Sequence, residues 1–550
     1  MKPRYCLRPA AYAVAIATCL GLFSCADPFL MVSARVPFLG EYLDSPQASS
    51  YLDGKFFAPP GTTVVLLKDG AEELSLTASA NGYKGDPFKF PKSYAVGSSY
   101  TLTVKSCSAG QTCRVEKGER GTIGLSPGFI RVGADFTNDL ISRSSDNSKF
   151  GRFNESSAPV VAGDFLEEGR YVAFVSSASG LGGASGKKRQ ILWRDRNTGE
   201  TRLVSAGLNG TEGNGDSVAP SISSDGQSVA FESYATNLVP IDTNKVRDIF
   251  VWNARTKVVT AVSTGPGEIE TNAESFEPAI SGDGTRVAFS SSASNLAPGV
   301  SGIDTINVYL KRVGSGQGPT LISADPITKK GVGGSRPSIS DDGSKIAFCS
   351  FASTLVPDDK NGLWDIFLYD AANPRLKRLS VANDGSERNR GDDSASRVVV
   401  PSISGNGNFV TFATTATNLV ANDTNNVQDA FIVNTSSGEV KRVSIGSNGE
   451  QGNADTPVNQ GEKIAISYDG SWVAFSTSAT TLGGNVVLKS SISGETRAIS
   501  PNNSTVGSPA ISRNGGYVVF GAGTRLDSRF PSSGIFARFT SLTRCRFCSR

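Results

Sequence analysis

The sequence of 550 residues contains no histidine. This absence excludes a Ser–His–Asp or Cys–His catalytic site, a histidine-ligated zinc site and a histidine proton shuttle. No segment matches a nucleophile elbow, a P-loop or a dinucleotide fingerprint. Acidic residues recur in turns throughout the chain, so no carboxylate pair stands out as a catalytic pair. The sequence therefore predicts a protein that is not an enzyme.

An excess of charge is also missing. The chain has 54 Lys and Arg against 51 Asp and Glu. Lys2, Arg4 and Arg8 lie at the N-terminus, and without them the basic and acidic residues balance at 51 each. Nucleic-acid binding needs a concentrated basic surface that neutralises phosphates. We therefore expect no nucleic-acid partner.

No hydrophobic run is long enough to span a bilayer. The longest run, from Ala10 to Phe23, has about 14 residues, whereas a spanning helix needs roughly 20. Because basic residues precede it, we predict that residues 1–25 are a secretion signal. The run ends in Leu22-Phe23-Ser24-Cys25.

This ending resembles the lipobox of bacterial lipoproteins. The resemblance implies that Cys25 is lipid-modified and anchors an exported protein in the cell envelope, without any other membrane contact. Ala26 follows Cys25, and in a diderm this implies the outer membrane, on its periplasmic or its surface side. Ordinary cleavage of a secretion signal is the alternative.

Cysteine is scarce, with 8 in the chain, and export permits disulfides. Cys107 and Cys113 flank a short turn and are predicted to form a hairpin disulfide. Cys349 is predicted to be a buried thiol in a core strand. Cys545 and Cys548 form a C-x-x-C without the helix that a redox site needs. A terminal disulfide and two incidental thiols both stay open.

Residues 26–130 show no repeat. Alternating or β-rich stretches predict strands at 62–67, 73–78 and 99–104. We expect a small antiparallel β-sandwich, immunoglobulin-like, as a separate domain.

Residues 137–550 carry an internal repeat of about 60 residues. Its clearest copy reads Ala-Pro-Ser-Ile-Ser-Ser-Asp-Gly from Ala219, followed by Val-Ala-Phe, Ala-Thr-Asn-Leu-Val and Asp-Ile-Phe. The proline recurs at positions 159, 220, 278, 337, 401 and 509, and Ile464 takes its place in one copy. Each copy predicts four antiparallel strands. In four copies an Asp-Gly turn follows the first strand, and in six copies a core phenylalanine lies in the second.

One four-stranded sheet cannot bury both faces alone, so neighbouring copies must cover it. The sequence therefore predicts an all-β fold, a β-propeller of about seven four-stranded blades, with six and eight as alternatives. Two segments compete to complete the last blade. Asp139–Ser142 repeats the fourth-strand phrase and is favoured, while Thr543–Ser549 is the rival.

The repeated phrases resemble those of TolB-type, WD-like propellers of bacterial envelopes. The resemblance covers residues 137–540. It implies contact with envelope proteins and does not name the partner.

Three copies carry an acidic loop before the third strand, in which the second aspartate follows the first by six residues. Carboxylate and amide oxygens are calcium ligands, so the loops are candidate calcium sites. The favoured alternative is structural, because Asp and Asn also shape turns through their own backbone. The candidate ligands are Asp242, Asn244 and Asp248, then Asp359, Asn361 and Asp365, then Asp423, Asn425 and Asp429.

These observations favour a non-catalytic, lipid-anchored envelope protein with a propeller face that binds protein. No cofactor is expected, with calcium as the exception already named, and a small-molecule ligand is neither predicted nor excluded. Two alternatives stay open: a glycan-binding or glycan-active propeller, and a calcium-stabilised structural or adhesive protein.

Overall fold

The computed structural model describes residues 138–540, except 147, 153–154, 164–168, 301–304, 391–399, 457–462, 501–505 and 524–533, and also the strands between 49 and 136. The elements are β-strands and the short 3-10 turns Leu208–Gly210, Pro266–Glu268 and Thr480–Leu482. In these described residues no helix is long and apolar enough to cross a bilayer.

The strands before residue 137 form two four-stranded sheets. One has the order β4-β1-β8-β6 and the other β3-β2-β5-β7. Their bounds are Ser49–Phe57 (β1), Thr63–Lys68 (β2), Glu72–Thr77 (β3), Asp86–Ala95 (β4), Ser99–Cys107 (β5), Gln111–Lys117 (β6), Arg120–Thr122 (β7) and Ile130–Phe136 (β8). The three strands predicted from the sequence correspond to β2, β3 and β5.

One pairing in these sheets differs from the prediction of an antiparallel domain. Strands β1 and β8 are parallel, with Gly54 opposite Ile130. Parallel neighbours need a long crossover, and β2 to β7 lie between these two strands in the sequence. The prediction of a wholly antiparallel domain is therefore wrong for this pair.

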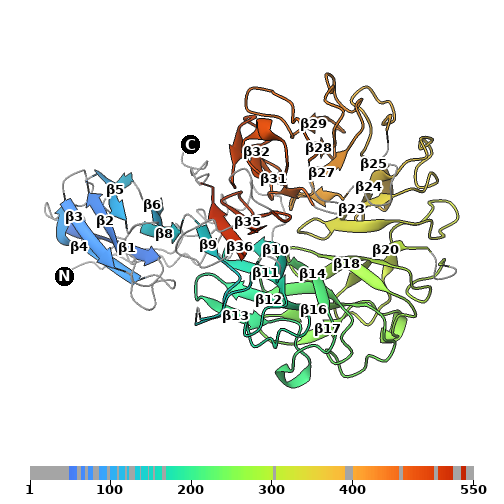
Figure 1. The fold of residues 1–550 in the computed structure, drawn as a ribbon, viewed down its shortest axis with the longest axis horizontal. Helices are drawn as coiled ribbons and strands as arrows, with labels where there is room; N and C mark the ends of the chain where they lie inside the picture. The colour runs from blue at the N-terminus through green and yellow to red at the C-terminus, as the bar shows by residue number, and fades with distance from the viewer. Residues whose placement is uncertain are drawn as a thin grey trace, which may run out of the picture. The chain divides into compact units, whose positions relative to one another are not determined.

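The seven repeats form seven four-stranded antiparallel sheets, as predicted. We number them blades 1 to 7, and they follow one another around a ring (Figure 1). Blade 1 comprises Ser156–Ala162 (β10), Tyr171–Ser176 (β11), Gln190–Asp195 (β12) and Glu200–Leu203 (β13). Blade 2 comprises Ser217–Ile222 (β14), Ser228–Ser233 (β15), Asp248–Asn253 (β16) and Val259–Ala261 (β17). Blade 3 comprises Ser275–Ile280 (β18), Arg286–Ser291 (β19), Asn307–Arg312 (β20) and Thr320–Leu321 (β21).

The remaining blades repeat this order. Blade 4 comprises Ser335–Ile339 (β22), Lys345–Ser350 (β23), Asp365–Asp370 (β24) and Arg375–Arg378 (β25). Blade 5 comprises Ser402–Ile403 (β26), Phe409–Thr414 (β27), Asp429–Asn434 (β28) and Val440–Arg442 (β29). Blade 6 comprises Ala465–Ile466 (β30), Trp472–Ser476 (β31), Val486–Ser490 (β32) and Thr496–Ala498 (β33). Blade 7 comprises Ala510–Ile511 (β34), Tyr517–Ala522 (β35), Gly534–Phe539 (β36) and Asn138–Leu140 (β9).

The Asp-Gly turns connect the first two strands of a blade. In blade 2 the Asp225 carboxylate accepts the Gln227 N–H at 3.0 Å, and Gly226 adopts a φ of 70°. This left-handed conformation is open to glycine at little cost, which explains why the repeat keeps glycine there.

The core lies between the blades. Phe231 is fully buried, stacks on Phe250 of its own blade at 5.8 Å, and packs with Ala173 and Ile191 of blade 1. The phenylalanines at the same register in the other blades are fully buried too: Phe289, Phe348, Phe412, Phe475 and Phe520. Cys349 lies in β23 with no exposed surface, as predicted, and burial raises its pKa to about 11. Each blade thus covers the apolar face of the next.

The N-terminal segment completes the last blade. Strand β9 pairs with β36, with Leu140 opposite Phe536. Ile141 joins Phe174 of blade 1 and Val519 of blade 7 in one buried cluster. Blade 7 is therefore built from both ends of the propeller sequence, as favoured above, and the rival segment 543–549 lies outside the described residues.

Candidate functional site

Two kinds of loop share one end of the propeller. Within a blade the strands alternate in direction, so the loop between the second and third strands lies at the same end as the connector to the next blade. Hydrogen bonds confirm this proximity: the Thr243 N–H donates to Glu270 at 2.7 Å, and the Lys360 N–H donates to Glu387 at 2.8 Å. We call this end the loop face and the opposite end the turn face.

The second aspartate of each acidic loop begins the third strand and holds it to the fourth. Asp248 accepts the Ser263 hydroxyl at 2.6 Å, and Ser263 accepts the Ile249 N–H at 2.9 Å. Asp365 accepts Ser380 at 2.5 Å in the same way, and Asp429 accepts Ser444. These bonds support the structural interpretation of the second aspartates.

The same serine position recurs in all seven blades. In each, its hydroxyl accepts a backbone N–H at the beginning of the third strand, from the first or the second residue. The serines are Ser142, Ser205, Ser263, Ser323, Ser380, Ser444 and Ser500. Ser142 takes this place in blade 7, which independently assigns the closing strand to the N-terminal segment.

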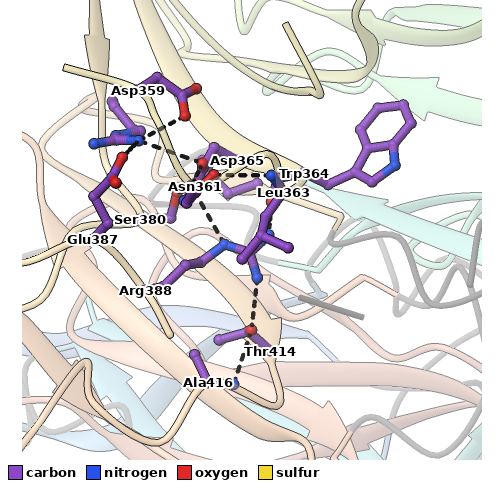
Figure 2. A network of polar contacts seen from close by, with 12 residues as sticks. Asp359, Asn361, Leu363, Trp364, Asp365, Ser380, Glu387, Arg388, Thr414 and Ala416 are labelled. Atoms are coloured by element: carbon purple, nitrogen blue, oxygen red, sulfur yellow. Dashed lines mark hydrogen bonds and ion pairs between the residues drawn. The ribbon is translucent and has the colours of Figure 1, made fainter. Parts of the chain in front are cut away.

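In blade 4 the acidic loop is neutralised by an arginine of the fourth strand. The Arg378 Nη1 lies 2.9 Å from Asp359, 3.6 Å from Asp365 and 2.7 Å from Glu387. The three carboxylates converge from the loop, the third strand and the connector (Figure 2). Arg388 adds a second contact, with its Nε 3.1 Å from Asp365. A guanidinium thus occupies the position that calcium would need.

Blade 5 repeats this arrangement. The Arg442 Nη1 lies 2.8 Å from Asp423, 3.4 Å from Asp429 and 2.9 Å from the Gln451 amide oxygen. Burial raises the pKa of Asp423 to about 6, and Arg442 opposes this rise. The two loops in blades 4 and 5 are therefore ion-paired structural elements.

Blade 2 has the carboxylates without the arginine. The corresponding position is Ala261, and in the described part of the chain no lysine or arginine forms an ion pair with Asp242, Asp248 or Glu270. Burial, followed by the charges of Asp248 and Glu270, raises the pKa of Asp242 to about 6. A cavity of about 450 Å³ lies beside these three carboxylates.

The raised pKa of Asp242 predicts a stability that depends on pH. Its pKa is about 6 in the folded chain against an ordinary value of 3.8. The folded state therefore binds the proton more tightly, and this stabilisation is lost as the pH rises through 6. The side chain introduced by Asp242→Asn is neutral at every pH. We therefore expect the free energy of unfolding of this variant to exceed that of wild type by about 1 kcal/mol at pH 7, a value discounted for solvent screening.

Thermal unfolding between about pH 4 and pH 7 measures this difference. The matched control is Asp384→Asn, because the Ser386 hydroxyl lowers the pKa of Asp384, so that substitution should give no gain at neutral pH. Equal stability of wild type and Asp242→Asn at pH 7 would contradict the assignment.

The remaining predicted site residues are only partly described. Asn244 and Asn361 each turn Nδ2 to the aspartate that begins the third strand, at 2.8 and 2.9 Å. Asn425 donates to the Gly452 carbonyl at 2.9 Å. Among the described residues no group of three or more acidic or cysteine side chains has the arrangement of a metal site, and calcium binding stays a prediction.

The predicted lipid anchor and disulfide are not tested. Cys25 lies outside the described residues, as do Cys545 and Cys548. Cys107 ends β5 and Cys113 lies in β6, two strands of different sheets, and their side chains are not among those described. The disulfide therefore stays a prediction.

A polar cluster at the centre of the turn face was not predicted from the sequence. Its side chains come from the residue that precedes the Asp-Gly or Asn-Gly turn in blades 2, 4, 6 and 7. The Arg513 Nη1 of blade 7 lies 2.5 Å from Asp341 of blade 4, and Ser224 of blade 2 donates to the same carboxylate at 2.8 Å. Arg513 also stacks over Tyr468 at 3.7 Å. These contacts connect blades 2, 4, 6 and 7 across the centre of the ring.

The loop face of blades 2 to 4 exposes large apolar side chains. Ile327 is 88% exposed and Ile241 is 73% exposed. Six such residues lie in loops or connectors of this face, and we call them the apolar patch: Tyr234, Ile241, Ile269, Ile306, Ile327 and Phe351. Among the described residues, Val258 and Ile492 are the two exposed large apolar residues on the turn face. The six residues of the apolar patch thus lie on one face, distributed over three consecutive blades.

Comparisons with known proteins give matches among solved structures, at low identity. No family model matches the chain, and no curated protein matches it. TolB from Acinetobacter baumannii is 14% identical, with 74% of this chain and 79% of that chain covered and a TM-score of 0.34. TolB-type propellers are among the structures that this chain resembles. That predicted resemblance is confirmed, as a likeness of fold.

Propellers of enzymes also match. The β-propeller domain of the Trilobed protease from Pyrococcus furiosus is 15% identical, with 72% and 98% of the two chains covered and a TM-score of 0.42. An oligogalacturonate lyase from Vibrio parahaemolyticus is 11% identical, with 80% and 98% covered and a TM-score of 0.41. At these identities the likeness extends to the fold alone.

Proposed function

We propose that this chain is an exported, lipid-anchored envelope protein whose loop face binds a protein partner without catalysing a reaction. The observation that carries the proposal is the apolar patch. It spans three consecutive blades, whereas the described turn face has only two comparable residues, each in a separate blade. Protein interfaces combine such an apolar centre with a polar rim, and the Asn- and Gly-rich loops supply the rim.

The charged groups of this face support a binding role over catalysis. In blades 4 and 5 the carboxylates are engaged by Arg378 and Arg442, so they cannot act as free acids or bases. The sequence also has no histidine to act as a general base beside them.

Photo-crosslinking in intact cells tests the binding face. A photoreactive amino acid at Ile327 or Phe351 should form covalent adducts with a specific protein. The same amino acid at Val258 or Ile492 on the turn face is the matched control, because these side chains are also exposed and apolar. Equal adducts from both faces, or adducts with polysaccharide in place of protein, would reject the proposal.

The anchor has its own test. Cys25→Ala should release the mature chain from the membrane fraction into the soluble fraction, because the lipid-bearing sulfur is lost. Cys349→Ala is the control, since that thiol is buried in blade 4 and should leave fractionation unchanged. A Cys25→Ala protein that still sediments with membranes would show that the anchor lies elsewhere.

A further inference from the structure

Blades 2, 4 and 5 carry acidic side chains at the same positions of their loops. In blades 4 and 5 an arginine of the fourth strand binds these carboxylates, whereas blade 2 has Ala261 at the position of the arginine. The fourth-strand residue opposite the third-strand aromatic ring is Arg378 against Phe367 in blade 4 and Arg442 against Phe431 in blade 5. In blade 2 the residue opposite Phe250 is Ala261. Ala261 therefore occupies the position from which the arginine side chain extends in the other two blades.

The groups that hold the guanidinium are all retained in blade 2. Asp242, Asp248 and Glu270 correspond to Asp359, Asp365 and Glu387 of blade 4 by their positions in the repeat. The loop conformation is retained as well, because the Thr243 N–H donates to Glu270 as the Lys360 N–H donates to Glu387. Blade 2 thus presents a complete binding site for a guanidinium that the chain does not itself supply.

The space for that group is open. The blade 2 cavity of about 450 Å³ is lined by Asp242, Asp248 and Glu270 and by Ala261. Among the residues that the structure describes, none forms a hydrogen bond with the buried Asp242 Oδ1. A buried carboxylate oxygen without a partner costs free energy, which a donor entering the cavity would recover.

The walls of the cavity suit an aliphatic stem. Val239, Ile241, Phe250 and Val259 line it beside the carboxylates. An arginine side chain places three methylene groups behind its guanidinium and packs them on apolar surface. Ile241 belongs to the apolar patch, so the cavity opens within the proposed partner surface.

The donors and acceptors of the cavity fit a guanidinium better than calcium. Asn244 turns its Nδ2 to Asp248 at 2.8 Å, and its Oδ1 accepts the Val246 N–H at 3.1 Å. The amide oxygen that calcium would need is therefore already engaged. A guanidinium needs only acceptors, and the three carboxylates supply them.

We propose that the blade 2 cavity receives an arginine side chain of the protein partner, in the place that Arg378 and Arg442 occupy within their own blades. This inference rests on the proposed function of the loop face. It assigns the partner a protruding arginine with an apolar surround, complementary in charge to the three carboxylates.

The test uses the mature full-length chain and a blocked arginine, Nα-acetyl-arginine methylamide, as the probe. Calorimetry or NMR titration at low salt should show saturable binding to wild type. The neutral citrulline analogue, which has the same shape, should bind at least tenfold more weakly. Indistinguishable binding of the two probes, or tighter binding of calcium chloride that displaces the arginine probe, would overturn the proposal.

Variants locate the binding. Ala261→Arg fills the cavity as blades 4 and 5 do, so it should abolish probe binding and raise the thermal midpoint. Val258→Arg adds the same charge at the turn face and should bind the probe as wild type does. Should Ala261→Arg fail to fold, Asp242→Asn provides the second test, with probe binding weakened at least tenfold.

Crosslinking from Ile327 separates this proposal from the proposed function. Ala261→Arg should reduce the protein adducts seen from Ile327, whereas Val258→Arg should not. Undiminished adducts in Ala261→Arg would overturn the arginine assignment and leave the binding face intact. Probe binding without any protein adduct in wild type would reject the binding face and, with it, the partner's arginine.

Discussion

Replacing Arg442 by alanine is expected to lower the free energy of unfolding by about 3–5 kcal/mol. The Arg442 side chain is 9% exposed, and its partners Asp423 and Asp429 are 2% and 1% exposed. Removal of the guanidinium leaves two carboxylates in a region of low dielectric constant, close enough to repel each other. Chemical denaturation followed by circular dichroism measures the loss.

The neighbouring residue provides the control. Lys441 pairs with Glu439 at 3.2 Å, but both side chains are more than half exposed. Exposed ion pairs contribute about 0–1 kcal/mol, so Lys441→Ala should be almost neutral. A loss in Arg442→Ala no greater than in Lys441→Ala would show that the carboxylates of blade 5 do not depend on the arginine.

The second large effect concerns ring closure. Ile141 has no exposed surface and packs between blades 1 and 7 with Phe174 and Val519. Ile141→Asp buries a carboxylate among apolar side chains and loosens the strand that joins the two ends of the ring. We expect a loss of more than about 4 kcal/mol, or failure to fold.

A conservative change calibrates this expectation. Ile141→Val removes one methylene group and should cost about 0.5–1.5 kcal/mol. Both variants are compared by denaturant midpoint and by susceptibility to proteolysis. An Ile141→Asp protein as stable as Ile141→Val would mean that the N-terminal segment does not complete blade 7.

The propeller could be predicted because its signals repeat. Phe231, Phe289 and Phe348 recur at one register, and the Asp-Gly turns recur at a fixed distance before them. Each repeat faces the same packing problem, so one local solution serves all blades. The closing strand was favoured for a similar reason, since Ser142 ends the same phrase as the fourth strands of the other blades.

The site could be predicted only in part. The acidic loops were recognised and their structural interpretation was favoured, but the partners Arg378 and Arg442 were not identified, because turn formation by Asp and Asn was expected to involve only the loop's own backbone. The signal was present in the sequence: each arginine precedes the fourth-strand serine by two residues, where blade 2 has Ala261. The pair of Asp341 and Arg513, 172 residues apart, could not be predicted, because neither residue repeats.

The loop face repeats one arrangement of carboxylates in blades 2, 4 and 5, and an arginine of the same blade binds them in blades 4 and 5. In blades 4 and 5 the arginine belongs to the chain, and its ion pairs with the carboxylates stabilise the fold. In blade 2 no lysine or arginine of the described chain forms an ion pair with the corresponding carboxylates, which lie beside the exposed Ile241. The register difference between the blades is Ala261 in place of the arginine, and the proposed recognition site rests on that difference.

Both the loop face and the match between blades depend on one claim, that the seven sheets form a ring closed by strand β9. Asp139 lies opposite Ala537 in the pairing of β9 with β36. Cysteines at these two positions should form a disulfide under mild oxidation of the folded chain, and peptide mass spectrometry identifies the link. The result that would contradict the account is the absence of a link between positions 139 and 537, together with a disulfide from position 537 to the C-terminal segment 543–549.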